Sequence, residues 1–355
     1  MIRDPELLAG LLDTLRRFVD ERLIPAEAQV EEDNAIPDAL IDEMRALGLF
    51  GMSIPEEYGG LGLTMEEEAL VAFEIGRASS AFRSVFGTNN GIGSQGIIVD
   101  GTEAQKQYWL PRMASGEVIG SFALTEPEVG SDAGAVRTTA VRDGDHYILN
   151  GTKRFITNAP VAGVFTLMAR TGGPGPSGVT AFLVPADLPG ITLGKIDRKM
   201  GQRGTKTCDV ILENVRVPAD AVIGGVEGLG FKTAMKVLNR GRLHISAICV
   251  GQAQRLCAES VSFANNRSQF GKPIAQHQLI QAMLADSGTE TWAGRAMVLE
   301  TARLFDEKAR IIKEAAACKL FCSEMVGRVA DRAVQIHGGS GYMSDFPVEH
   351  FYRDV

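Results

Sequence analysis

Basic residues are in the minority in this chain, and long apolar runs are missing. Among its 355 residues, lysine and arginine number 36 against 44 aspartates and glutamates, so the formal net charge is −8. Such a chain repels nucleic-acid phosphates and anionic membrane surfaces. No apolar stretch reaches the roughly 18 residues of a membrane-spanning helix. We therefore expect no nucleic-acid partner and no membrane partner, and an anionic small ligand would need a local basic pocket.

Cysteine is scarce as well. The chain has five cysteines, an odd number without a secretory leader, which fits free thiols in a reducing compartment. Cys318 and Cys322 are one helical turn apart, but no histidine or carboxylate completes a ligand set at a familiar spacing, so no metal site is expected. Asp4, Glu6 and Asp13 make the N-terminus unlike a transit peptide. These features predict a soluble, cytoplasmic protein.

Two sequence signatures are also missing. No internal repeat is visible, and no G-x-G-x-x-G follows a strand, which leaves a dinucleotide-binding, doubly wound sheet without support. The remaining composition, 45% hydrophobic and 23% charged, is that of an ordinary globular protein. At about 150 residues per domain, the length predicts two or three domains.

The N-terminal third has helical periodicity. Leucines and other apolar residues recur at three-and-four spacing over residues 5–23, and a second helical stretch covers 38–47. Thr64 with Glu67, and Thr102 with Gln105, have the spacing of capping boxes that open further helices. Residues 1–117 are therefore predicted to form an all-helical domain.

The middle of the chain changes to β-branched residues that alternate with polar ones. Asp143-Gly144 is typical of a tight hairpin turn, and further strand-like runs cover 164–169, 179–184 and 210–217. Several short strands within about a hundred residues favour a compact barrel or sandwich. We predict a middle β domain, a β-barrel or sandwich, at residues 118–222.

From Gly230 the period is helical again for over a hundred residues. Breaks occur near 271–273 and near Arg310, and Gly338-Gly339 reads as the stop of the last long helix. Three or four long helices would pack as a bundle. The predicted fold class is thus α+β, with an N-terminal helical domain, a middle β domain and a C-terminal helical bundle at residues 223–355.

Two polar segments of the middle region can carry chemistry. Residues 123–132 read A-L-T-E-P-E-V-G-S-D and leave a strand for a loop whose amides and hydroxyls could hold an isoalloxazine edge or a phosphate. Residues 151–158 read G-T-K-R-F-I-T-N. Taken singly, the first is equally an ordinary turn and the second an ordinary core strand, so the pair carries more weight than either member.

Together the two segments closely resemble the acyl-CoA dehydrogenase family, whose corresponding motifs are T-E-P-x-x-G-S-D and G-x-K-x-[WF]-I-T-N. The resemblance extends over almost the whole chain. Further matching segments are residues 200–204, 213–218, 239–242 (N-R-G-R, expected to open a helix), 267–271 with 277–278, 335–342 and 352–354.

The resemblance implies FAD as the cofactor. Six residues of the two segments would contact the flavin ring and its neighbourhood: Phe122, Leu124, Thr125, Ser131, Phe155 and Thr157. Thr125 and Thr157 would hydrogen-bond ring heteroatoms, although β-strand propensity alone also accounts for threonines here.

A second group matches family positions where one subunit reaches the FAD diphosphate and adenosine of its neighbour. An arginine suits a diphosphate because its fork pairs two oxygens at once, although a solvated arginine at a helix end is the plainer alternative. The match implies at least a dimer, and the family is usually tetrameric, so a homotetramer is expected. The residues are Arg267, Gln269, Phe270, Gln335, Gly338 and Gly339.

The implied reaction oxidises an acyl-CoA thioester to the 2,3-enoyl-CoA, as in fatty acid metabolism. A carboxylate removes the α proton while the β hydrogen leaves as a hydride to flavin N5, and an electron-transfer flavoprotein then takes the electrons. Two alternatives stay open. The same scaffold could serve other flavin chemistry, such as an oxidase or a desulfinase, or the protein could bind flavin and acyl-CoA without turnover.

The catalytic glutamate of the family has no counterpart among these residues. In most relatives it lies shortly after the R-D that matches Arg353-Asp354, whereas the sequence ends at Val355. Other relatives carry the base just before the arginine that matches Arg242, and Gly241 occupies that position. Either a C-terminal segment of the bundle follows Val355, which is the expectation, or the protein is a variant without the base. No residue of this sequence is assigned as catalytic.

Clues to the substrate are few. The resemblance implies that Ser131 and Arg242 bind the CoA arm. Phe82-Arg83-Ser84 resembles the segment in which glutaryl-CoA dehydrogenases hold an arginine for the distal carboxylate of the substrate, although Gly87 departs from the serine found there. Arg83 would then select a dicarboxylyl chain, and a structural ion pair is the alternative. A basic cluster at 195–206 could meet CoA phosphates or be a solvated loop.

Overall fold

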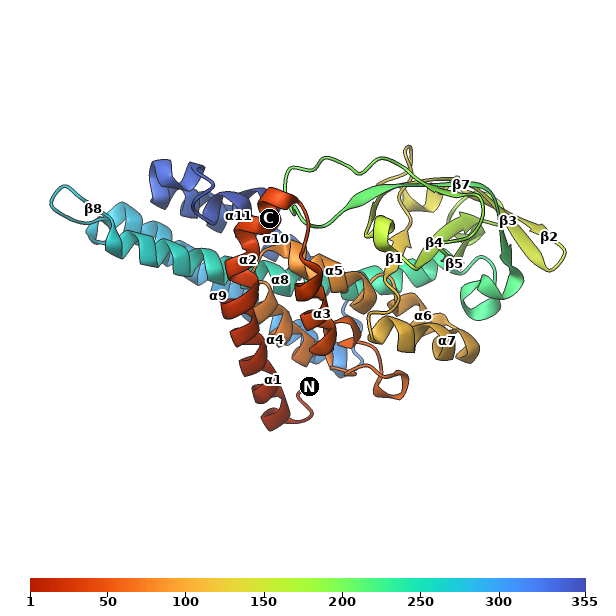
Figure 1. Ribbon diagram of the computed structural model, residues 1–355. Coiled ribbons are helices and arrows are strands. Elements are labelled where there is room, and N and C mark those ends of the chain that lie inside the picture. Colours follow the sequence, from red (N-terminus) through yellow and green to blue (C-terminus); the bar gives the residue numbers. More distant parts are fainter.

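The computed structural model describes residues 1–355, and its three parts follow one another along the chain (Figure 1). Helices come first, a curled sheet occupies the middle, and a bundle of long helices ends the chain. This arrangement confirms the α+β fold class predicted from the sequence. None of the helices combines the length and the apolar character needed to cross a membrane.

The N-terminal part contains seven α-helices. Both predicted capping boxes are present, because the Thr64 and Thr102 hydroxyls accept from the third residue of their helices while Glu67 and Gln105 accept in return. The helices are α1 (Pro5–Phe18), α2 (Ile24–Asp33), α3 (Asp38–Ala46), α4 (Met65–Ile75), α5 (Ser80–Asn90), α6 (Gln95–Asp100) and α7 (Glu103–Ala114).

The first helix does not stop at Leu23 as expected. A π-helical turn over Val19–Leu23 joins α1 to α2, with the Ile24 amide donating to the Val19 carbonyl. Pro25 lacks an amide proton, and the wider turn lets the chain pass it without breaking the helical rod. The rod therefore continues to Asp33 and brings the acidic residues of α2 against the end of the chain.

The middle part is one seven-stranded sheet, curled over its own core. β4 (Val164–Arg170) is central, since it pairs in parallel with β1 (Gly120–Ala123) and antiparallel with β5 (Val179–Pro185). The predicted turn at Asp143-Gly144 is confirmed and joins β2 (Thr139–Asp143) to β3 (His146–Thr157). β3 pairs with β7 (Thr207–Pro218), and β6 (Ile191–Leu193) completes the edge.

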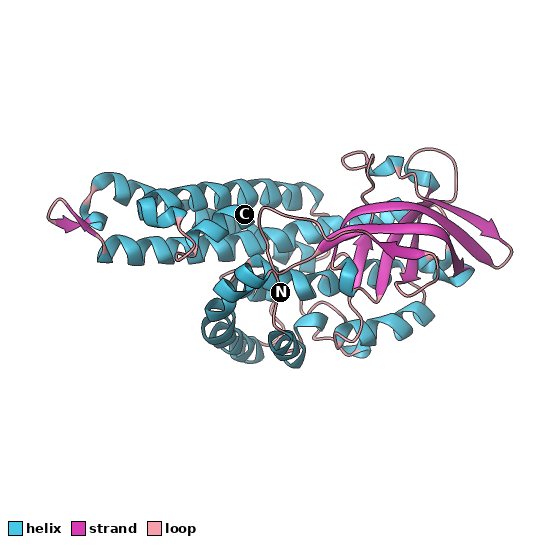
Figure 2. Ribbon diagram, turned by 45° about the horizontal axis from the view of Figure 1, so that its top comes forward, coloured by secondary structure: helices cyan, strands magenta, loops and turns pink.

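The C-terminal part is dominated by three long helices that lie side by side (Figure 2). These are α8 (Gly230–Asn266), α9 (Gln278–Asp306) and α10 (Ile312–His337), followed by the short α11 (Val348–Asp354). A small hairpin of β8 (Ser268–Gln269) and β9 (Lys272–Pro273) links α8 to α9. The predicted stop at Gly338 is confirmed, since α10 ends at His337 and Gly338 has φ +58°.

The long α8 helix begins at Gly230, where the helical period returns in the sequence. Residues 239–242 therefore do not open a helix as the family motif implied, but lie about two and a half turns inside α8. A Cβ on Gly230 would lie 2.5 Å from the backbone nitrogen of Ala181 in β5, so the glycine allows the helix to begin in close contact with the sheet. With 37 residues, α8 is about 55 Å long and connects the sheet to the far end of the bundle.

Candidate active site

Two adjoining cavities lie where the sheet, α5 and the first half of α8 meet. The first, which we call the sheet-side cavity, has a volume of about 580 Å³, and the second, the polar cavity, about 390 Å³. Four residues line both cavities: Ile92, Thr157, Leu238 and Arg242. The two spaces therefore meet at Thr157 and Arg242, and a long ligand can occupy both.

The sheet-side cavity gathers the two polar segments of the sequence around one space. Nine of its 17 lining residues are hydrophobic, which suits a large, flat ligand. The segments contribute six predicted residues, and Arg242 joins them from α8: Phe122, Leu124, Thr125, Ser131, Phe155, Thr157 and Arg242.

A buried ion pair holds the wall of this cavity in place. Lys153 is fully buried, and its Nζ lies 2.7 Å from Glu126 Oε1 and 3.2 Å from the Leu124 carbonyl oxygen. Burial lowers the pKa of Lys153 to about 8, so the ammonium remains charged at neutral pH. Glu126 also accepts from the backbone amides of Arg137 and Thr138. The loop that carries Leu124 and Thr125 is thus fixed from behind.

Phe155 faces the same cavity from a strained position in β3. Its φ is +58°, unusual for a residue other than glycine, and 63% of the residue is exposed. The register of β3 against β7 shifts between Lys153 and Ile156, so a bulge turns the ring out of the sheet. Backbone strain of this kind concentrates at functional sites.

The cavity also offers polar groups that the protein does not use itself. The hydroxyls of Thr125, Ser131 and Thr157 hydrogen-bond no other protein atom, and all three residues line the space. Unpartnered hydroxyls beside an exposed aromatic face fit the edge and the plane of an isoalloxazine ring. The residues present therefore suit a flavin.

The residues predicted to reach the FAD of a neighbouring subunit lie at the end of the molecule opposite the sheet. These residues are exposed and come from the β8–β9 hairpin and from the end of α10 (Figure 1). The Phe263 and His337 rings stack at 4.2 Å, and Ala264, Ile274 and Ile336 are buried together beneath the two segments. The elements that carry these six residues lie at the end of the bundle remote from the sheet-side cavity of the same chain: Arg267, Gln269, Phe270, Gln335, Gly338 and Gly339.

The polar cavity contrasts with its neighbour in composition. Only three of its 17 lining residues are hydrophobic, and four cations face a single carboxylate, Glu68. The cations are Arg83 from α5, Arg240 and Arg242 from α8, and Lys319 from α10.

Glu68 at the floor of the polar cavity is buried and held by two partners. Arg240 pairs with both carboxylate oxygens, and His244 Nδ1 lies 2.8 Å from Oε1. Burial alone would raise the pKa of Glu68, but Arg240 and His244 lower it to about 2. A carboxylate this strongly stabilised as the anion is a poor base.

Arg83, predicted as a substrate residue, stands at the side of this cavity. Its Nε donates to His244 Nε2 at 3.2 Å, and it forms no salt bridge with any carboxylate. Burial lowers the pKa of Arg83 to about 10, which leaves the guanidinium cationic at neutral pH. The structural ion pair considered as the alternative is therefore absent from the structure.

The end of the second polar segment ties β3 to the helix that carries Arg83. Asn158, at φ +63°, donates from Nδ2 to the Ser84 carbonyl at 2.8 Å and to the Thr88 hydroxyl at 3.0 Å. This contact sets α5 against the sheet, and with it the position of one cavity relative to the other.

Of two further positions considered in the sequence, the cations of the basic cluster at 195–206 lie outside both cavities and Gly241 lies in the polar cavity. The basic cluster at 195–206 forms a loop whose cations line neither cavity, and Lys199 donates instead to the Gln202 and Thr205 carbonyls. Gly241 does line the polar cavity, and a Cβ there would meet no atom within 4 Å.

Several lining residues were not identified from the sequence. Phe231, Met235 and Leu238 precede Arg242 at intervals of four, three and four residues, so one face of α8 lines the sheet-side cavity. That spacing was available in the sequence. No local signal connects His244 with Glu68, because they lie on different helices and far apart in the chain.

Comparison with known proteins agrees with this geometry. Family models described as acyl-CoA dehydrogenase N-terminal, middle and C-terminal domains match residues 7–117, 121–215 and 228–355. The human mitochondrial short-chain specific acyl-CoA dehydrogenase is 41% identical over 99% of this chain and 85% of its own length. The acryloyl-CoA reductase (NADH) of Anaerotignum propionicum is 41% identical over 100% of this chain and 90% of its own.

Among solved structures, the butyryl-CoA dehydrogenase of Megasphaera elsdenii superposes with a TM-score of 0.95 at 33% identity, covering 100% of this chain and 94% of that one. Sequence, fold and cavity chemistry thus agree over the whole length of the chain. The chain belongs to the acyl-CoA dehydrogenase family and is a flavin-dependent oxidoreductase.

Proposed function

We propose that the protein holds FAD in the sheet-side cavity and oxidises an acyl-CoA thioester to the 2,3-enoyl-CoA. The observation that carries this proposal is the junction of the two cavities at Thr157 and Arg242. A wall that fits a flavin there meets a pocket that can hold the acyl end of a thioester. The reacting carbons would lie at that junction.

The residues of the two polar segments would bind the flavin ring. Phe155 would cover its face, and the Thr125 and Thr157 hydroxyls would hydrogen-bond its heteroatoms, while Phe122, Leu124 and Ser131 would line its surroundings. When bound, FAD supplies the acceptor for a hydride from the β carbon. The buried Lys153–Glu126 pair keeps this wall in one conformation, which is the preorganisation that such chemistry needs.

A second copy of the chain would complete the FAD site. The six exposed residues at the hairpin and the end of α10 cannot reach the sheet-side cavity of their own chain, because the length of the bundle lies between them. Arg267 is exposed and its guanidinium would suit a diphosphate, and Gln269, Phe270, Gln335, Gly338 and Gly339 are exposed at the same end of the bundle. At least a dimer follows from this proposal, and a homotetramer is expected.

The thioester would enter along α8. Ser131 and Arg242 are placed to bind the CoA arm, and the acyl chain would continue into the polar cavity toward Arg83. Because Arg83 has no carboxylate partner of its own, it would pair with a carboxylate at the distal end of the acyl chain. The proposed substrate class is therefore a dicarboxylyl thioester.

Removal of the α proton needs a carboxylate base, and Glu68 does not fit that role. Its charge is already neutralised by Arg240, which keeps its pKa near 2. After hydride transfer, an electron-transfer flavoprotein is the proposed acceptor of the electrons.

The reaction is tested by anaerobic titration of the flavin-loaded protein with a panel of acyl-CoA thioesters. Loss of the visible absorbance of oxidised flavin supports the proposal, and an unchanged spectrum with every thioester contradicts it. Gly241→Glu is the companion variant, because a side chain at this position enters open space in the polar cavity. If only this variant loses its colour on titration, the chain lacks a base of its own.

A second candidate function is reduction of an enoyl thioester, the reverse direction on the same scaffold. The observation that favours it is the 41% identity with acryloyl-CoA reductase (NADH). NADH consumption with an enoyl-CoA and an electron-transfer flavoprotein, without oxidation of the matching acyl-CoA, would select this direction.

A further inference from the structure

Arg83 is useful to an anionic ligand only if its guanidinium points into the cavity. A free arginine side chain samples many rotamers, and ordering it on binding costs free energy. In this structure the group is already ordered, because Nε donates to His244 Nε2 at 3.2 Å. The terminal nitrogens Nη1 and Nη2 hydrogen-bond no protein atom and remain available on the cavity side.

His244 is itself held by groups behind it. Nδ1 lies 2.8 Å from Glu68 Oε1, and Glu68 is fixed in turn by Arg240, one helical turn before His244 on α8. Both His244 and Glu68 are buried, at 4% and 1% exposure. In the neutral tautomer that carries its proton on Nδ1, the imidazole presents a lone pair at Nε2 to the Arg83 Nε–H, while Nδ1 lies in close contact with the carboxylate but outside hydrogen-bonding geometry. The imidazole thus connects the buried carboxylate to the guanidinium.

Gly87 makes room for this arrangement on the other side. It lies one turn after Arg83 on α5, and a Cβ at Gly87 would come within 2.8 Å of Arg83 Nε and 2.9 Å of Cζ. Such contacts are shorter than van der Waals distance, so in this chain a side chain at position 87 would require the flexible end of Arg83 to move from its present contact with His244. The departure from serine at this position therefore has a structural consequence.

We propose that His244, oriented by Glu68 and given space by Gly87, is a positioning residue that aims Arg83 at the distal carboxylate of a dicarboxylyl thioester. This inference rests on the proposed function in one respect, that a CoA thioester enters the polar cavity. It assigns the selectivity for the acyl chain to two residues, His244 and Gly87, that do not touch the reacting carbons.

Two substitutions of His244 separate positioning from packing. Glutamine keeps one donor for Glu68 and one acceptor for Arg83, whereas leucine fills a similar volume with neither. His244→Gln is expected to retain the selectivity, and His244→Leu is expected to lose it. Gly87→Ala is the second route to the same result, because it moves Arg83 and leaves the buried histidine unchanged.

The test compares glutaryl-CoA with pentanoyl-CoA, which have acyl chains of equal carbon number and differ in the distal charge. Their dissociation constants are measured calorimetrically on the flavin-loaded protein, and KM and kcat are measured on the same preparations. The wild type is expected to bind glutaryl-CoA on the order of tenfold more tightly. His244→Leu and Gly87→Ala should lose most of that preference through KM, with pentanoyl-CoA changed less than about threefold.

The outcomes are distinct. If His244→Leu keeps the full preference, or weakens both thioesters equally while flavin content is unchanged, the inference is overturned. If Gly87→Ala keeps the preference when His244→Leu does not fold, it is overturned as well. If the wild type binds the two thioesters equally, the role of Arg83 fails. A preference in binding without any bleaching of the flavin would contradict the proposed reaction and leave the inference supported.

Discussion

The two cavities share α8 and four lining residues, yet their walls have opposite chemistry. Hydrophobic residues make up nine of the 17 around the sheet-side cavity and three of the 17 around the polar cavity. The change takes place along one helix: Phe231, Met235 and Leu238 are apolar, whereas Arg240 and His244 carry polar heads. A single helix can thus present a flat, apolar surface to a ring and a charged end to a polar chain.

The buried ions of the two regions differ in the same way. The Lys153–Glu126 pair lies behind the wall of the sheet-side cavity and supports a loop, while Glu68, Arg240 and His244 lie in the polar cavity itself. We infer that the first pair holds the shape of the wall, and that the second group, besides contributing to stability, serves selectivity.

Lys153→Met should destabilise the protein most, by about 3–5 kcal/mol, because it leaves Glu126 buried without its partner. The double variant Lys153→Met with Glu126→Gln should be more stable than the single one, since no uncompensated charge remains. Urea unfolding measures both. A single variant as stable as the wild type would mean that the pair does not support the wall.

Glu68→Gln should change how stability depends on pH. The pKa of Glu68 is about 2 in the folded chain against an ordinary 4.5, so its contribution of about 3 kcal/mol is present above pH 4.5 and lost as the pH falls toward 2. Between about pH 5 and pH 3, the wild type should therefore lose more free energy of unfolding than the variant. Parallel losses in urea unfolding would contradict the pairing with Arg240.

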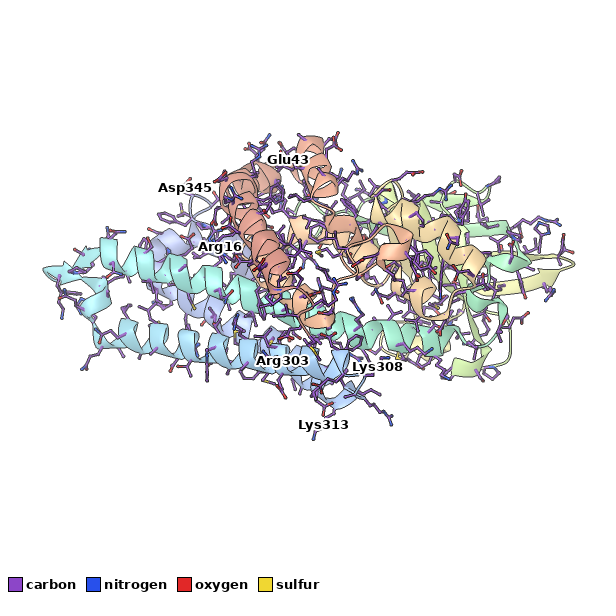
Figure 3. The ribbon with its side chains drawn as sticks, turned by 90° about the horizontal axis from the view of Figure 1, so that it is seen from below. Arg16, Glu43, Arg303, Lys308, Lys313 and Asp345 are labelled. Atoms are coloured by element: carbon purple, nitrogen blue, oxygen red, sulfur yellow. The ribbon has the colours of Figure 1, made fainter.

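Arg267→Ala should weaken FAD retention and assembly together, by on the order of a hundredfold in FAD affinity, because the guanidinium is proposed to bind the diphosphate across an interface. The control is Lys313→Ala, which removes an exposed cation at the start of α10, whereas the predicted FAD residues lie near the end of that helix (Figure 3). Absorbance measures the flavin content, and light scattering measures the mass of the oligomer. Full FAD occupancy in an intact oligomer of the Arg267 variant would contradict the proposed contact with the diphosphate.

Arg83→Ala should reduce kcat/KM for glutaryl-CoA by on the order of tenfold and leave pentanoyl-CoA nearly unchanged. The effect is the smallest of the four because it removes a single charged contact at the far end of the substrate. Equal losses for both thioesters would assign Arg83 to folding instead of selectivity.

Local signals in the sequence predicted much of the fold. The capping boxes at Thr64 and Thr102, the Asp143-Gly144 turn and the stop at Gly338 each depend on a few neighbouring residues, and all are present. Helix α5 was not identified individually, because nine of its eleven residues are buried and polar ones such as Asn89 and Asn90 are buried together with the apolar ones, so burial does not follow an apolar period. The helical period indicated that α8 begins near Gly230, but no local pattern encodes the close contact of Gly230 with β5.

In the site, too, local motifs predicted some residues, whereas contacts between distant helices were not predicted. The family motifs predicted that Thr125 and Phe155 would share one ligand, and the structure brings both to the sheet-side cavity. The same motifs did not indicate the polar network, because the contact between His244 and Glu68 depends on how α4 packs against α8. Spacing along one helix can be read from a sequence, but a pairing between distant helices needs the folded chain.

The most direct test of this account is an anaerobic titration of the flavin-loaded protein with glutaryl-CoA and pentanoyl-CoA, monitored by the visible absorbance of the flavin. We predict that the colour is lost, and that glutaryl-CoA is effective at concentrations on the order of tenfold lower. A spectrum that neither thioester changes, or a protein that is purified as a colourless single chain and does not respond to added FAD, would contradict it.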